Sequence, residues 1–162
     1  MAVDIILNID GVTGESLVDG HTDEIDILAW SWGLTQSGTT HMGPGAGGGK
    51  VNVQDITMTK YVDLASNDLI KKCCDGTHIA SAELYVRKAG GATPIEYLVI
   101  TFKEIMVTSY STGGSEDGLD RVQETFSLNF AEFNMTYTKQ DATGAEAGSA
   151  SAGWNIPTGT HV

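Results

Sequence analysis

The chain has 162 residues, 41% of them hydrophobic, and its 21 acidic and 9 basic side chains give a formal net charge of −12. This length and apolar content predict one folded domain over residues 1–162 and exclude a disordered chain. The negative charge, with no local cluster of lysine or arginine, excludes binding to nucleic acid or to anionic membranes. No apolar run reaches the ~20 residues of a membrane-spanning helix, so no membrane insertion is expected.

The N-terminal part reads as a series of strands. Residues 3–9, VDIILNI, form the first, and no basic segment precedes them. We therefore expect synthesis in the cytoplasm without a secretory signal peptide. In residues 25–34 the apolar positions change parity after Ile27, which predicts a bulge or a strand covered on both faces. Residues 50–61 continue the β pattern.

One segment, at about residues 66–75, has the pattern of a helix. Ser66 is expected to cap its start and Gly76 to end it. Four apolar side chains then share one face at helical spacing: Leu69, Ile70, Cys73 and Cys74. This spacing predicts that both thiols are buried and reduced, with a redox role for the neighbouring cysteines as the lesser alternative.

The rest of the chain returns to β patterns. Residues 82–89, 95–110 and 121–139 are predicted strands, and residues 141–153 are interpreted as a tether of small residues that leads to Trp154 as a docking anchor. Strands without βαβ alternation predict a mainly β fold, a compact barrel or sandwich of about eight strands with one short helix.

A glycine-rich segment, GPGAGGGKV at residues 43–51, has the look of a phosphate-binding loop. It fails the requirements of one, because Pro44 stands at the first glycine position, Val51 replaces the hydroxyl that holds Mg²⁺, and a strand follows it. We interpret it as a hairpin connection.

Catalytic and metal-binding patterns are also missing from the sequence. Four scattered histidines are expected on the surface or in loops: His21, His41, His78 and His161. The acidic clusters at 19–26 and 113–120 lack the ligand spacing of a Ca²⁺ loop and are interpreted as solvated turns. We therefore expect no enzyme, no catalytic residue, no cofactor and no metal, and instead a protein that binds, scaffolds or assembles.

Several blocks of sequence, taken in order, identify a family resemblance: EIDILAWSWGLTQSG, HMGPGAGGGKVNVQD, TKYVD, VRKAGG, EYLVITFKEIMVTSYSTGG and SLNFAEFNMTY. With them the chain resembles the Hcp family, the haemolysin-coregulated tube proteins of bacterial type VI secretion, over residues 1–140 and again at GWNI. The resemblance implies a β-barrel with one short helix that assembles as a homo-hexameric ring. It also implies that rings stack into a tube inside a contractile sheath, meet a spike protein at the tip, carry and chaperone small effector proteins in the lumen, and leave the cell by type VI secretion.

Two regions are candidates for roles in such a ring. In residues 28–34 we expect Trp30 and Trp32 to pack into the core with their leucine neighbours. The alternate face carries Ala29 and Ser31, and we expect it either to let a neighbouring element pack closely or to line the lumen and contact cargo. In the loop 38–49 we expect contacts to a neighbouring subunit or ring from Thr40, His41, Met42, Gly45 and Gly47.

Two further expectations concern the assembly. A hexamer of this chain carries a formal charge of six times −12, or −72, so its rings are expected to stack better at higher salt. The alternative from a different class is a monomeric β-sandwich that binds carbohydrate, with Trp30 and Trp32 as a stacking platform.

Overall fold

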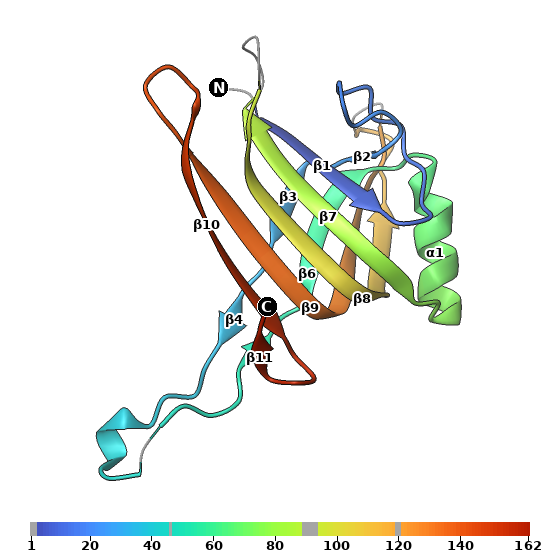
Figure 1. Cartoon of the computed structure of the whole chain (residues 1–162). Coiled ribbons are helices and arrows are strands. Elements are labelled where there is room, and N and C mark those ends of the chain that lie inside the picture. Colours follow the sequence, from blue (N-terminus) through green and yellow to red (C-terminus); the bar gives the residue numbers. More distant parts are fainter. Residues whose placement is uncertain (1–2, 46, 89–93, 119–120) are drawn as a thin grey trace.

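The computed structural model describes residues 3–45, 47–88, 94–118 and 121–162. In Figure 1 the six longer strands build most of the molecule: β1 (Val3–Ile9), β6 (Ile56–Tyr61), β7 (Ile79–Lys88), β8 (Glu96–Gly113), β9 (Gln123–Gln140) and β10 (Glu146–Asn155). The shorter ones are β2 (Ile25–Asp26), β3 (Ala29–Ser31), β4 (Leu34–Thr35), β5 (Asn52–Val53) and β11 (Thr160–His161). The predicted fold class, mainly β with one short helix, is confirmed.

The segment 25–31 closes the sheet into a barrel. β1, β7, β8, β9 and β6 are neighbours in that order, and all pairs are antiparallel. β2 then pairs with β1, whereas β3 pairs with β6, so one stretch of chain joins the two outer strands. At the transfer, Ile27 N donates to Ile5 O at 2.9 Å and Leu28 N donates to Thr59 O at 2.8 Å. This change of partner explains the change of apolar parity after Ile27.

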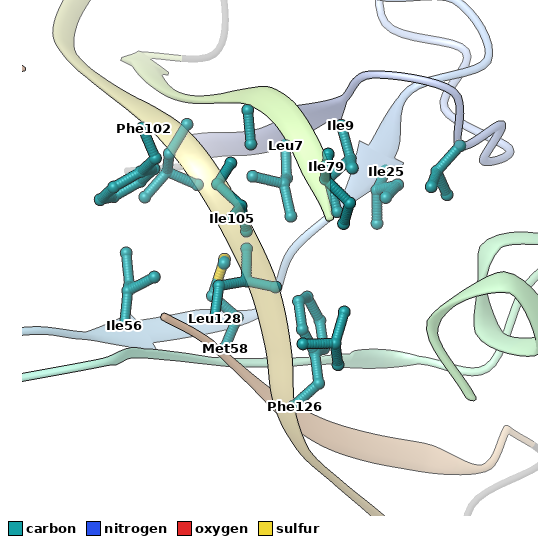
Figure 2. Close-up of a cluster of buried hydrophobic side chains, with 14 of the residues drawn as sticks. Leu7, Ile9, Ile25, Ile56, Met58, Ile79, Phe102, Ile105, Phe126 and Leu128 are labelled. Carbon is teal, nitrogen blue, oxygen red and sulfur yellow. The ribbon is translucent and has the colours of Figure 1, made fainter. Parts of the chain in front are cut away.

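The core fills the space between the two sides of this barrel. Figure 2 shows side chains of β1, β2, β7 and β8 facing those of β6 and β9, with Leu7 and Ile105 on one side and Met58 and Leu128 on the other. Since alternate residues of each strand point inward, the long strands β8 and β9 supply aromatic as well as aliphatic side chains to it.

The helix α1 (Ala65–Asp75) lies at the right of Figure 1, at one end of the barrel. Its start is capped by Asp63 and not, as predicted, by Ser66: Asp63 Oδ1 accepts from Ala65 N at 2.9 Å. The Oγ of Ser66 reaches back to accept from Asp63 N at 2.9 Å, which is the reciprocal arrangement of a capping box. The prediction for Gly76 is correct, because it ends the helix in the left-handed region and donates to Lys72 O.

The predicted burial of the thiols is half wrong. Leu69 is buried and Cys73 packs against the core, but Ile70 and Cys74 are exposed. The helix lies on the end of the barrel and covers it with a narrow stripe, so the second position of each apolar pair turns outward.

The predicted tether is also wrong, because residues 146–155 form β10. This strand pairs with β9 from Glu146↔Gln140 to Asn155↔Glu132, so the backbone of β9 orders a segment that has few apolar side chains. Gly153 is required there, since a Cβ at this position would lie 2.8 Å from both Asn134 and Val162. β9 pairs with β6 before Ala131 and with β10 after it. The carbonyl of Ala131 accepts from Ile156 N at 2.8 Å.

Residues 34–45 and 47–53 form an arm that extends away from the barrel at the lower left of Figure 1. β4 and β5 pair at its base, and a short 3-10 turn, Thr40–Met42, lies near its tip. Within it Gly38 bridges to Gly48, and Thr39 N and Oγ1 both donate to Gly47 O.

Candidate functional site

The residues predicted to face a lumen lie on an exposed part of the barrel wall. Ala29 and Ser31 are both exposed on β3, and the partly buried Trp30 between them points to the opposite side. Strand register continues this side of the wall across three more strands, where Ser109 and Ser111 are exposed, the threonines are half-buried and Ser127 is buried. One row runs Ser31, Thr57, Ser127, Ser109, and the next runs Ala29, Thr59, Thr125, Ser111.

We call these eight residues the hydroxyl face. Seven of them are serine or threonine, none is charged, and none is large. Hydrogen bonds join neighbouring strands within each row: Ser109 Oγ lies 2.5 Å from Ser127 Oγ, and Thr59 Oγ1 lies 3.3 Å from Thr125 Oγ1. In a chain with 30 charged side chains, eight uncharged positions in register on four strands are a distinct feature of the molecule. The carboxylate of Asp55, which accepts from Thr108 and Asn129, marks the edge of this patch.

The two tryptophans of this region pack inward. Trp30 and Trp32 are partly buried against the core. The Trp32 ring lies edge-on to Phe133 at 4.8 Å between centroids, and its Nε1 donates to Gln54 O at 2.9 Å. A stacking platform for a sugar needs exposed ring faces, so this packing gives no support to the carbohydrate-binding alternative.

Their predicted leucine neighbours do not join them, which is a correction. Leu28 is 44% exposed and Leu34 is 48% exposed. The strand pattern assumed one continuous strand over 25–34, but the chain transfers from β1 to β6 at Leu28 and enters the arm at Leu34.

The predicted contact loop forms the outer part of the arm. Thr40, His41 and Met42 are exposed in its 3-10 turn, with Met42 at 72%, and Gly45 and Gly47 follow on the exposed return path. Gly45 has φ of +88°, a conformation that favours glycine, so the glycines here serve the shape of the turn.

A groove of about 460 Å³, which no sequence pattern predicted, opens between the base of the arm and the end of β10. Its apolar lining includes Leu34, Val53, Phe133, Trp154 and Ile156. Lys50 and His161 also line it, and the His161 ring lies edge-on to Trp154 at 4.9 Å. The predicted anchor Trp154 therefore packs against the core and forms one wall of this groove.

His21 lies in a loop, one of the two predicted settings, but it is buried and not on the surface. It is 6% exposed, and its Nδ1 lies 2.7 Å from Glu24 Oε2 while its Nε2 contacts Glu96. Burial by itself lowers the pKa of His21, but the hydrogen bonds to Glu96 and Glu24 outweigh it and raise the pKa above 6.5. The imidazolium thus fastens the loop 10–24 to the start of β8.

A second buried polar cluster joins α1 to the barrel. Lys60 is completely buried, and its Nζ lies 2.5 Å from Glu124 Oε1 and 2.6 Å from Asp63 Oδ1. Ser66 donates to Glu124 at 2.7 Å, and Tyr110 also donates to it. Burial and the hydrogen bond to Glu124 raise the pKa of Tyr110 to about 12, so its hydroxyl stays protonated. We call these five residues the lysine cluster; its cation is paired with two carboxylates and serves stability.

Over the described residues, no group of three or more His, Cys, Asp or Glu side chains is close enough to hold a metal ion. No helix of these same segments is long and apolar enough to cross a membrane. Three surface features stand out in the structure: the hydroxyl face, the arm and the groove.

Comparisons with known proteins agree with the resemblance seen in the sequence. A model of the family described as type VI secretion system effector, Hcp, matches residues 6–137. The chain is 52% identical to Protein hcp1 of Pseudomonas aeruginosa PAO1 over 157 residues, which is 96% of each chain. Among solved structures it is similar to a type six secretion system protein, with a TM-score of 0.92, 29% identity, and coverage of 99% of this chain and 100% of that one. It is also similar to Hcp1 from Salmonella typhimurium, with a TM-score of 0.82, 38% identity and full coverage of both chains.

Proposed function

The chain belongs to the Hcp family of type VI secretion proteins, and we propose that it is the tube subunit of such a system. In this proposal six copies form a ring, rings stack into the inner tube, and the tube carries small effector proteins in its lumen. The subunit acts as a structural protein and carrier, without catalysis. A contractile sheath outside the tube and a spike at its tip are the other partners that the family implies.

The hydroxyl face is the observation that carries the proposal. A tube through which varied proteins pass needs a wall that neither repels nor traps them. Charged side chains hold oppositely charged cargo and repel like charge, whereas large apolar ones bind unfolded chains. Small hydroxyl side chains avoid both, and they leave the bore wide. We assign the hydroxyl face, including Ala29 and Ser31, to the lumen wall.

The arm supports the assembly part of the proposal. An exposed methionine at the tip of a projecting hairpin is apolar surface that a neighbouring copy could cover. We propose that Thr40, His41 and Met42 contact a neighbouring subunit or ring. The glycines Gly45 and Gly47 shape the return of the hairpin.

Thiol accessibility tests the lumen assignment. In a background of Cys73→Ala and Cys74→Ser, a Ser31→Cys variant is assembled into tubes and treated with a small maleimide or with one that carries a bulky polymer. We expect the small reagent to label tubes at the rate of free rings and the bulky reagent to label them at least tenfold more slowly. If the bulky reagent labels tubes as fast as it labels free rings, with tubes visible by electron microscopy, Ser31 lies outside the lumen.

A further inference from the structure

The groove at the base of the arm is open space among the residues that the structure describes. Its floor is formed by Phe133, Trp154 and Ile156, and its rim carries the cation Lys50 together with His161. The three segments that supply most of its lining, residues 33–38, 47–53 and 152–162, contain no aspartate or glutamate, although the chain has 21. An apolar side chain flanked by acidic groups is the chemistry that this surface fits.

A side chain of that description stands at another end of the molecule. Leu17 is 90% exposed, the highest value for a large hydrophobic side chain among the described residues, and Glu15 and Asp19 stand exposed on either side of it. The surrounding residues 10–26 hold six carboxylates and no lysine or arginine.

The loop holds Leu17 in a fixed position. Ser16 is fully buried beneath it, Ser16 N donates to Glu24 O at 2.9 Å, and Asp23 N donates back to Ser16 O at 2.9 Å. The paired His21 anchors the same loop. A leucine presented on such a rigid support loses little conformational entropy when a partner covers it.

Leu17 cannot enter the groove of its own chain. In Figure 1 its loop lies beside α1 at the upper right, whereas β4, β5 and β11 meet around the groove at the lower edge. The two surfaces can therefore meet only between copies, in a heterologous contact. Such a contact closes into a ring when its rotation closes and otherwise continues as an open stack. The loop and the groove lie toward opposite ends of the barrel in Figure 1, which favours the open stack.

We propose that Leu17 of one copy docks in the groove of the next copy, and that this contact joins successive rings of the tube. Glu15 and Asp19 then approach Lys50 and His161, so the acidic loop of one copy meets a groove whose lining contains no carboxylate. The proposal rests on the proposed tube function for its place in the assembly, but the contact itself is between two copies of this chain.

Site-directed disulfide formation tests the contact directly. In the Cys73→Ala and Cys74→Ser background, Leu17→Cys is combined with Ala152→Cys, an exposed residue that lines the groove. The matched control combines Leu17→Cys with Ser149→Cys, an exposed residue of β10 that does not line the groove. After mild oxidation, a non-reducing gel is expected to show a ladder of cross-linked chains at least tenfold stronger for the first pair than for the control.

Two outcomes overturn the docking. No ladder, or equal ladders for both pairs, shows that Leu17 does not sit in the groove. A ladder from Met42→Cys with Ala152→Cys, in the absence of one from Leu17→Cys, assigns the groove to the arm of another copy. Electron microscopy of the same samples separates this result from the proposed function, because a ladder without rings refutes the hexamer alone, and rings without a ladder refute the docking alone.

Discussion

The lysine cluster allows a prediction whose size follows from its burial. Lys60→Met keeps most of the volume of the side chain and removes its charge. Glu124 then remains buried with only hydroxyl donors, those of Ser66 and Tyr110, and Asp63 loses its close cation. Removing one member of a buried ion pair costs about 3–5 kcal/mol, because the partner charge stays desolvated.

We expect this loss in the free energy of unfolding, and a fall in Tm of about 6–20 °C at about 2–4 °C per kcal/mol for a chain of this size. The assay is urea denaturation followed by tryptophan fluorescence, with all variants at one protein concentration because assembly adds to apparent stability. An unchanged m-value would show that the native and unfolded states expose the same surface as before.

Lys103→Met is the matched control, since Lys103 is 61% exposed and pairs with Glu132 at 3.2 Å. An ion pair with this exposure contributes little that can be measured, so its midpoint should equal that of the unmodified chain. If Lys60→Met also leaves the free energy of unfolding within about 1 kcal/mol of the unmodified chain, the lysine cluster does not stabilise the attachment of α1 to the barrel.

Three other predictions concern pH, the arm and salt. The raised pKa of His21 means that the folded state holds the proton more tightly than the unfolded state; its contribution is complete below pH 6.5 and is lost as the pH rises through the folded pKa. Tm should therefore fall above pH 6.5 in the unmodified chain, and His21→Gln should flatten this slope; parallel curves would show that His21 does not titrate. Deleting residues 45–48 should weaken ring or tube formation by electron microscopy while leaving the circular dichroism spectrum and Tm of the barrel unchanged, and normal assembly would show that the arm is not a contact. Sedimentation should show rings stacking more as salt rises, and Lys50→Glu should move the onset to higher salt; an onset that stays in place would remove Lys50 from the ring contact.

The sequence predicted the long strands because their inward side chains alternate with outward ones. The same alternation contained a signal for the lysine cluster. Ile56, Met58 and Lys60 share one parity, so a strand whose inner face is apolar carries its lysine inward as well. Glu124 shares parity with Phe126 in the same way. Two opposite charges at core positions of two predicted strands indicate a buried pair, although only strand register shows that they meet.

Other features could not be predicted from a single strand pattern. The hydroxyl face gathers its residues from β3, β6, β8 and β9, and only Ala29 and Ser31 stood out in the sequence. β10 was missed because its order comes from backbone pairing with β9, while its small side chains bury little surface until Gly153. The groove exists only where the arm meets β10, and these two segments are about a hundred residues apart in the sequence.

The net charge of the rings determines which of the proposed contacts can stabilise stacking. Two rings of −72 each repel over their whole facing surfaces, whereas the attraction of Lys50 and His161 for Glu15 and Asp19 acts between exposed groups at close range. Exposed pairs contribute only about 0–1 kcal/mol each, so they set orientation and cannot offset the repulsion of the whole rings. Salt shortens the Debye length from about 8 Å near physiological strength to about 3 Å at 1 M and removes most of that repulsion. What remains is the burial of Leu17 in an apolar groove, which salt leaves intact, and this is why stacking should increase with salt although the docking ends are oppositely charged.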